Sequence, residues 1–240
     1  MPPLDVLTVK YEVTTKSDTV GAGRDQFKDK PMIFYDCSTA PSPRRTRIFL
    51  AEKGADVETR DINLGKGEQL ADDFLSINPR ATVPVLMTDD GVALTENVAI
   101  ASYLEDAFPE PPLMGRTPTE RAEILMWNAI CEAQGLLAVA DALRNANPHM
   151  KGRAVTGPVN FDQIPALAER GMTRVGLFYK LLDERFANQS NIVGNTLSFA
   201  DITAFVVCDF ARVIKMRVDE TYPNLHTWYQ AMKDRPSAAI

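Results

Sequence analysis

The chain has 240 residues, of which 45% are hydrophobic and 24% are charged, a composition typical of a globular protein with a sizeable core. Its formal net charge is −6 and no Lys/Arg run exceeds two residues, which argues against nucleic-acid binding, because that usually needs a basic surface. No stretch approaches the roughly 20 apolar residues of a membrane span, so no membrane partner is expected.

Residues 1–30 precede the first element that we expect to fold. They contain no apolar stretch like that of a secretory signal, and their acidic residues alternate with five basic ones, whereas transit peptides contain few acids. We interpret them as an extension or a loosely attached arm that can be removed at little cost. A docking segment is the alternative.

The cysteines and histidines are few and scattered. Cys37, Cys131 and Cys208 are far apart and form no CxxC motif, and His149 and His226 are the only histidines. Neither a disulfide framework nor a metal site is therefore expected. Reduced thiols of this kind indicate the cytoplasm.

The first part of the chain alternates short apolar runs with helical patterns. Asp89-Asp90-Gly91 predicts a hairpin turn, and Pro84 is expected at the start of a strand, where a cis bond is tolerated. The order β-α-β-α-β-β-α is that of an α/β, thioredoxin-like domain, which we assign to residues 31–110. The expected elements are strand 33–35, helix 44–53, strand 57–62, helix 67–76, strand 83–87, strand 92–94 and helix 95–108.

A second domain is expected over residues 116–240, after a proline-rich linker that favours extended chain. No convincing strand alternation follows the linker. Capping boxes at Thr117–Glu120 and Ser198–Asp201 each predict a sharp helix start. The second domain is therefore predicted to be all-α, with helices over 118–146, 165–187, 199–214 and 224–234.

The turn after the first strand has an unusual composition for a thioredoxin-like domain. Domains of this kind that perform redox chemistry carry Cys-Pro-x-Cys there, because the helix N-terminus lowers the pKa of a thiol. This chain has Ala40-Pro41-Ser42-Pro43 instead. We infer that the anion-stabilising site is kept and that the thiol is supplied by a ligand.

Three stretches in this order and spacing, together with Ser198 to Thr203, carry a family resemblance: 39–54, 78–86 and 94–100. Residues 32–240 resemble a glutathione transferase over nearly their whole length. The resemblance implies a detoxification enzyme that activates the glutathione thiolate for attack on a small hydrophobic electrophile. It also implies glutathione as co-substrate, no permanently bound cofactor, and a homodimer.

The resemblance places the glutathione contacts on two segments. Val83 would pair its backbone with the cysteinyl group, while Glu96 would meet the γ-glutamyl ammonium. Asn97, where the family usually has Ser, would contact the γ-glutamyl carboxylate at a helix N-terminus. The alternative for Glu96 is a simple charge on its own helix, and for Arg80 a solvated surface arginine. The full set is Arg80, Thr82, Val83, Pro84, Glu96 and Asn97.

The group that activates the thiol is the least determined part of the site. One alignment with the family places Ala40 at the usual catalytic position, and another places Ser42 there. Ser42 could donate a hydrogen bond to the thiolate, with Thr39 and Ser38 as further candidates. The alternative role for Ser42 is the N-cap of the following helix.

The second domain offers further candidates. Arg144 and Asn145 could activate the thiol if the first turn does not, and Trp127 belongs either to the electrophile pocket or to the core. The residues leave two other functions open. A glutathione-dependent thiol/disulfide oxidoreductase would use Cys37, and a non-catalytic glutathione-binding module would need no activator.

Overall fold

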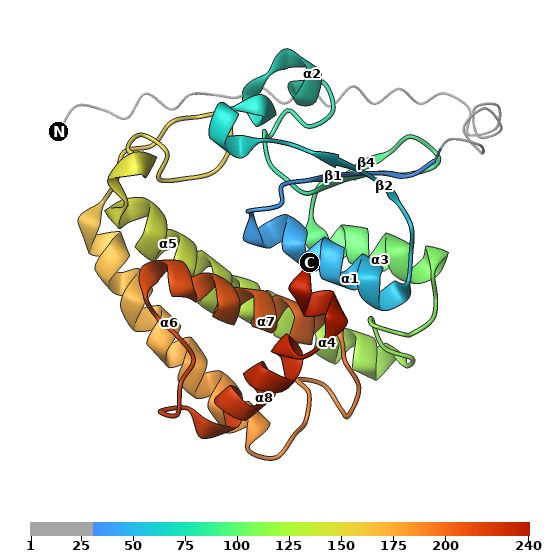
Figure 1. Ribbon diagram of the computed structural model, residues 1–240, viewed down its shortest axis with the longest axis vertical. Coiled ribbons are helices and arrows are strands. Elements are labelled where there is room, and N and C mark those ends of the chain that lie inside the picture. The colour runs from blue at the N-terminus through green and yellow to red at the C-terminus, as the bar shows by residue number, and fades with distance from the viewer. Residues whose placement is uncertain (1–30) are drawn as a thin grey trace.

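The computed structural model describes residues 31–240, so the predicted extension at 1–30 lies outside the described residues. The first elements form a four-stranded sheet with helices on both faces (Figure 1). In chain order they are β1 (Ile33–Asp36), α1 (Pro41–Lys53), β2 (Glu58–Asp61), α2 (Asp72–Leu75), β3 (Val85–Met87), β4 (Ala93–Leu94) and α3 (Asn97–Ala107).

The sheet has the strand order β2-β1-β3-β4. β1 and β2 are parallel, whereas β3 is antiparallel to both β1 and β4, which confirms the predicted order of parallel strands followed by a hairpin. Neighbouring residues of β1 point to opposite faces. Phe34 enters the main core with α1 and α3, and Tyr35 enters a smaller cluster with Phe74 of α2 and Val85.

The helix expected at 67–76 forms only in part. Two single-turn 3-10 helices, Leu64–Lys66 and Glu68–Leu70, precede the four-residue α2. Gly67 lies between them with φ of 76°, in the left-handed region that glycine adopts easily, and it ends the first turn. Ala71 is extended, so the backbone cannot continue as one helix.

The remainder of the described chain is helical, as predicted. The expected helix 118–146 runs without a break but contains a π-helical turn, Cys131–Leu136. Figure 1 shows α5 and α6 side by side, with α7 running through the middle of the domain. The helices are α4 (Pro118–Ile130), α5 (Leu137–Ala146), α6 (Pro165–Phe186), α7 (Phe199–Phe210) and α8 (Pro223–Lys233).

Two glycines allow close helix packing in this domain. A Cβ on Gly171 of α6 would lie 2.6 Å from the carbonyl oxygen of Ala138, and one on Gly135 would lie 2.7 Å from the ring of Phe178. Both distances are shorter than real contacts allow, so a side chain at either position would push the helices apart.

Both predicted capping boxes are present. Thr117 and Glu120 exchange hydrogen bonds at the start of α4. At the start of α7, Ser198 donates from its backbone and its hydroxyl to the Asp201 carboxylate, which also accepts from the backbone of Ile192. Burial raises the pKa of Asp201 to about 6, against the opposing effect of these hydrogen bonds.

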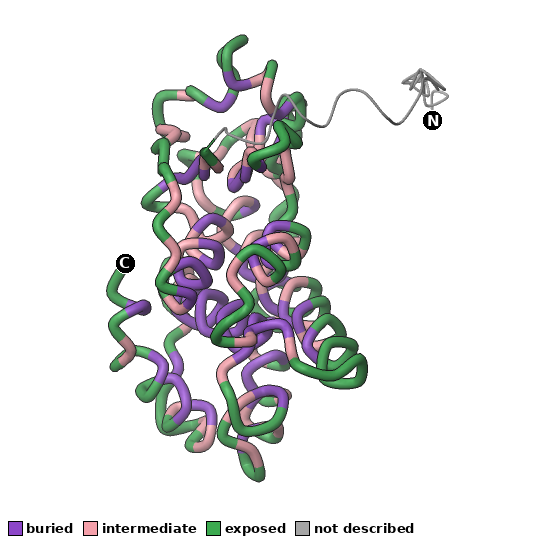
Figure 2. The backbone as a smooth tube through the Cα atoms, turned by 90° about the vertical axis from the view of Figure 1, so that its right-hand side faces the viewer, coloured by how far each residue is buried: buried purple, intermediate pink, exposed green. Residues whose placement is uncertain are grey.

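The main core is continuous between the sheet domain and the helical domain. α7 is buried from Phe199 to Asp209, and α1 packs against it. Phe49 of α1 and Phe199 form an edge-to-face pair with ring centroids 5.8 Å apart. Figure 2 shows the buried positions concentrated in the interior of the described part of the chain. No helix of the described residues is both long enough and apolar enough to cross a membrane.

Candidate functional site

The turn between β1 and α1 is held in place by one arginine. The Arg47 guanidinium donates to both carboxylate oxygens of Asp36, at 2.7 and 2.9 Å. It also donates to the backbone carbonyls of Cys37 and Ser38, both at 3.1 Å. Because this fork of donors ties the turn to β1, the first turn of α1 is positioned before any ligand arrives.

The first turn of α1 offers an unusual set of donors. The helix begins at Pro41 and its N-cap is Ala40, so the alternative role of Ser42 as the N-cap is wrong. Pro41 and Pro43 carry no backbone N–H. Ser42 therefore supplies the one amide of the first three helical positions, and no acceptor for it appears among the described residues. An anion is favoured at such a helix end.

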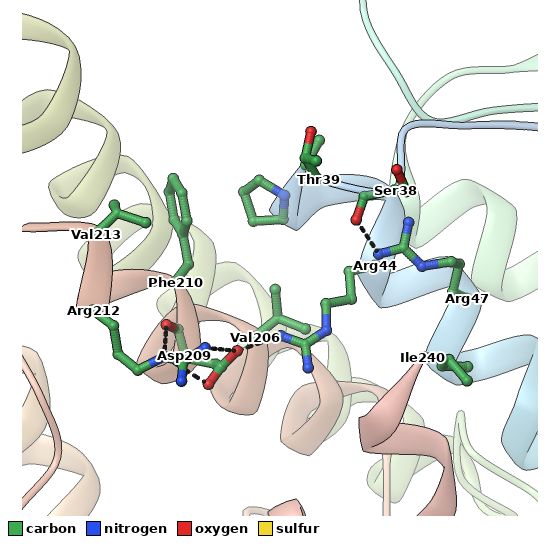
Figure 3. Close-up of a pocket in the computed structure, with 12 residues that line it drawn as sticks. Ser38, Thr39, Arg44, Arg47, Val206, Asp209, Phe210, Arg212, Val213 and Ile240 are labelled. Carbon is green, nitrogen blue, oxygen red and sulfur yellow. Dashed lines mark hydrogen bonds and ion pairs between the residues drawn. The ribbon is translucent and has the colours of Figure 1, made fainter. Parts of the chain in front are cut away.

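A cavity of about 370 Å³ opens between this turn and the C-terminal end of α7. Figure 3 shows Thr39 and Arg44 on one side of it, opposite Phe210 and Val213. Ser42 is half-buried and does not line the cavity. The lining residues are Ser38, Thr39, Ala40, Pro41, Arg44, Arg47, Val206, Asp209, Phe210, Arg212, Val213 and Ile240.

Asp209 of α7 organises the charged wall of the cavity. Its carboxylate accepts hydrogen bonds from Arg44 of α1, from Arg212 at 3.1 Å and from the Tyr229 hydroxyl at 2.7 Å. Burial alone would raise the pKa of Asp209, but hydrogen bonds from Tyr229 and Arg44 outweigh burial and hold that pKa below its usual value. Arg44 also donates to the carbonyl of Ala238 at 2.8 Å, so this cluster joins α1 to two parts of the helical domain.

A second polar cluster lies on the sheet domain, at the start of α3. The Arg80 guanidinium is 3.0 Å from the Glu96 carboxylate and also donates to the Thr95 hydroxyl. Glu96 is the N-cap residue of α3, and Asn97 is its first helical residue. The Asn97 side chain is buried and accepts a hydrogen bond from Thr46 of α1 at 3.0 Å, which ties the start of α3 to α1.

The segment before β3 is organised by a buried amide. Asn78 donates to the carbonyl and the hydroxyl of Thr82 and accepts from the backbone of Arg80. The bond between Val83 and Pro84 is cis, as the sequence analysis expected. The structure thus brings Arg80 and Glu96 together directly and holds Thr82 and Val83 on the same ordered segment.

The three candidates from the second domain do not line the cavity. Trp127 packs against the core, with the Arg185 guanidinium 5.0 Å from its ring centroid. Arg144 donates to the carbonyl of Arg153 at 2.8 Å. The Asn145 side chain donates to the carbonyl of Asp141 and accepts from the backbone of Ile164, so it joins the end of α5 to the start of α6.

Arg44, Asp209 and Arg212 were not singled out by the sequence analysis. The one signal that could have found them is a charged residue, Asp209, near the end of a helix that is apolar from Ala204 to Cys208. Burying a carboxylate is costly unless it is paired, so such a residue predicts a cationic partner. Among the described residues, no group of three or more His, Cys, Asp or Glu side chains is placed to hold a metal ion.

Two family models match the chain. One, described as the glutathione S-transferase N-terminal domain, matches residues 39–107, and the other, the glutathione S-transferase C-terminal domain, matches residues 136–236. The chain is 36% identical over 217 residues to glutathione S-transferase 2 of Saccharomyces cerevisiae. That match covers 90% of this chain and 91% of the yeast protein.

Solved structures give the same result. The crystal structure of Gtt2 from Saccharomyces cerevisiae matches with a TM-score of 0.78 and 34% identity, over 86% of this chain and 98% of that one. A glutathione S-transferase from Methylobacillus flagellatus KT, solved with GSH bound, matches with a TM-score of 0.73 and 25% identity. That match covers 87% of this chain and 97% of the other.

Proposed function

Because the chain belongs to the glutathione S-transferase family, we propose that it binds glutathione across the sheet domain and places the thiolate at the first turn of α1. The protein is a glutathione transferase with a thioredoxin-like first domain. The electrophile binds in the cavity between α1 and α7, where Thr39 faces Phe210 and Val213.

The exposed pair of Arg80 and Glu96 suits the γ-glutamyl end of glutathione. That end carries an ammonium and a carboxylate on one carbon, and the pair presents the two opposite charges 3.0 Å apart. Glu96 receives the ammonium, while Arg80 and the free amide end of α3 at Asn97 receive the carboxylate. Thr82 and Val83, ordered by Asn78, present backbone groups to the cysteinyl part.

The thiolate is stabilised by the N-terminal turn of α1. The observation that carries this proposal is the position of Ser42, whose amide lacks an acceptor among the described residues in a turn with two prolines. Its hydroxyl is the first candidate donor to the thiolate, and Thr39, which lines the cavity, is the second. Both stay catalytic candidates, Ser42 because it belongs to the first turn of α1 and Thr39 because it lines the cavity.

To test this proposal, the thiolate absorbance of the enzyme–glutathione complex is measured as a function of pH in the wild type and in each variant, which gives the pKa of the bound thiol. Removing a hydrogen bond to a charged group costs about 1.5–3 kcal/mol, so loss of the activating hydroxyl should raise the thiol pKa by roughly one to two units. We expect this alkaline shift in Ser42→Ala, with glutathione affinity little changed. A shift in Thr39→Ala alone would transfer the role to Thr39, and a shift in Asn145→Ala would assign it to the second domain.

The two other functions considered for the sequence are not favoured. An oxidoreductase would need an accessible thiol, but Cys37 is buried at the end of β1, with its Sγ 3.5 Å from the Thr39 hydroxyl. A non-catalytic binding module is not favoured either, because relatives that match most of the chain are named as transferases. Disulfide reduction that disappears in Cys37→Ser would contradict this choice.

We also propose that the protein is a cytoplasmic homodimer with a role in detoxification. The described cysteines are free and buried, which supports a reducing compartment. Large apolar side chains are exposed on α4 to α6, and such faces often mark interfaces. Sedimentation velocity measures the monomer–dimer equilibrium. Leu137→Glu or Leu177→Glu should shift that equilibrium toward the monomer. The exposed side chains are Leu125, Met126, Leu137, Met172 and Leu177.

A further inference from the structure

The cavity between α1 and α7 has an apolar wall and a charged wall. Val206, Phe210 and Val213 of α7 and the following turn form the apolar part. Figure 3 shows the Arg212 guanidinium beside Asp209, with Phe210 and Val213 extending from the same segment toward the opening. An occupant that satisfies both walls therefore needs an apolar body and a polar end.

Among the side chains of the charged wall, arginines outnumber the carboxylates that pair with them. Arg47 forms an ion pair with Asp36, with 2.7 Å between Nη1 and Oδ1, so its positive charge is already paired. Arg44 and Arg212 share a single carboxylate, that of Asp209. Asp209 is the one acidic side chain among those that line the cavity in the described part of the chain, so two guanidiniums share one side-chain carboxylate.

Arg212 is the guanidinium that remains available to a ligand. Its Nε and one terminal nitrogen contact Asp209 at 3.0 to 3.1 Å, and the other terminal nitrogen has no partner among the described residues. The Arg212 side chain is 53% exposed, whereas that of Arg44 is 21% exposed and is also bound to Ala238. A carboxylate entering the cavity can therefore reach Arg212 without breaking an existing bond.

We propose that the second substrate is an electrophile with an apolar body and an anionic group, and that Arg212 selects it by pairing with that group. This rests on the proposed function, since it names the substrate class of the same cavity. In an aryl halide of this class, the glutathione thiolate attacks the ring carbon that bears chlorine and forms a C–S bond. The C–Cl bond breaks, chloride leaves with the bonding electrons, and the thiol proton has passed to solvent.

The experiment compares 4-chloro-3,5-dinitrobenzoate with its methyl ester, which has the same leaving group but no charge. For each, kcat/KM is divided by the rate constant of the uncatalysed reaction with glutathione, and the ratio of the two quotients is the anion preference. We expect the wild type to prefer the carboxylate and Arg212→Gln to lower that preference about tenfold, the effect of losing one charge-assisted hydrogen bond. Arg212→Lys should restore part of it.

Arg217→Gln is the matched control, because Arg217 is also exposed and follows in the same segment but does not line the cavity. It should keep the wild-type preference. Raising the ionic strength from about 0.1 M to about 1 M shortens the Debye length from about 10 Å to about 3 Å and should reduce the preference of the wild type.

Three outcomes would overturn the inference. A preference unchanged in Arg212→Gln would show that the arginine selects nothing. An equal loss for both electrophiles with a raised thiol pKa would assign Arg212 to the thiolate, and a raised KM for glutathione alone would assign it to a glutathione carboxylate. Failure of the proposed function looks different, because then the wild type would accelerate the reaction of neither electrophile.

Discussion

Two arginine–carboxylate clusters in this protein use the same chemistry in opposite surroundings. The Arg80–Glu96 pair lies on the open surface of the sheet domain, with the side chains 58% and 67% exposed. The Arg44–Asp209 pair lies between the domains, with the side chains 21% and 10% exposed. Water solvates the first pair on most sides, whereas protein surrounds most of the second.

The difference in burial indicates a difference in role. An exposed ion pair contributes about 0–1 kcal/mol to stability. Breaking the Arg80–Glu96 pair so that each residue can bind an opposite charge of a ligand therefore costs little free energy. A buried pair is weak evidence for net stability, but removing one partner leaves an uncompensated charge, which costs about 3–5 kcal/mol. The first cluster is suited to binding, and the second is suited to fixing α1 against α7 and shaping the cavity.

Asp209→Ala should have the largest effect on stability. It leaves Arg44 and the Tyr229 hydroxyl without their acceptor in a mostly buried place, so the free energy of unfolding should fall by about 3–5 kcal/mol. Urea unfolding followed by circular dichroism measures this. A loss below about 1 kcal/mol would mean that water replaces the carboxylate and that the two clusters do not differ.

Glu96→Ala should have the next largest effect, on affinity instead of stability. Loss of a charge-assisted hydrogen bond to the glutathione ammonium should weaken binding by roughly 1–3 kcal/mol. Isothermal titration calorimetry measures the affinity, and Glu58→Ala is the control, because Glu58 forms a similarly exposed pair with Arg60 away from the site. Unchanged affinity in Glu96→Ala would remove Glu96 from the glutathione site.

The pH dependence of stability should show the contribution of Asp209. Its pKa in the folded protein lies below the ordinary value of 3.8, so the folded state binds this proton less readily than the unfolded state. The resulting stabilisation is present above that value and is lost as the pH falls through the lower, folded pKa, with a slope of at most about 1.4 kcal/mol per pH unit. Urea unfolding between about pH 5 and about pH 2, on both sides of the unfolded value of 3.8, should show a shallower decline in Asp209→Asn. Equal slopes would contradict the assignment.

Arg80→Gln should have the smallest effect on stability. Because the pair with Glu96 is exposed, the free energy of unfolding should change by about 0–1 kcal/mol. The melting temperature, measured beside that of Asp209→Ala, tests the comparison directly. A loss in Arg80→Gln as large as that in Asp209→Ala would mean that the exposed cluster also supports the fold.

Much of the fold was predictable because its signals are local. The capping boxes at Thr117 and Ser198 and the cis Pro84 each depend on a few neighbouring residues, and all three occur where the sequence indicates them. The helix expected at 67–76 forms only in part for an equally local reason, since Ala71 is extended and separates the turn at Glu68–Leu70 from α2. The domain limits at 31–110 and 116–240 stay predictions.

The sequence by itself determined the order of the elements and the family, and it grouped Arg80, Thr82, Val83, Glu96 and Asn97 into one candidate site. The family resemblance is what groups them, and they belong to two segments joined by a short hairpin, which keeps them close together along the chain. The tertiary structure alone decided the cavity, because Arg44 and Asp209 are 165 positions apart. Their pairing depends on how α1 packs against α7, and that packing is set by the shared core around Phe49 and Phe199, which no local pattern records.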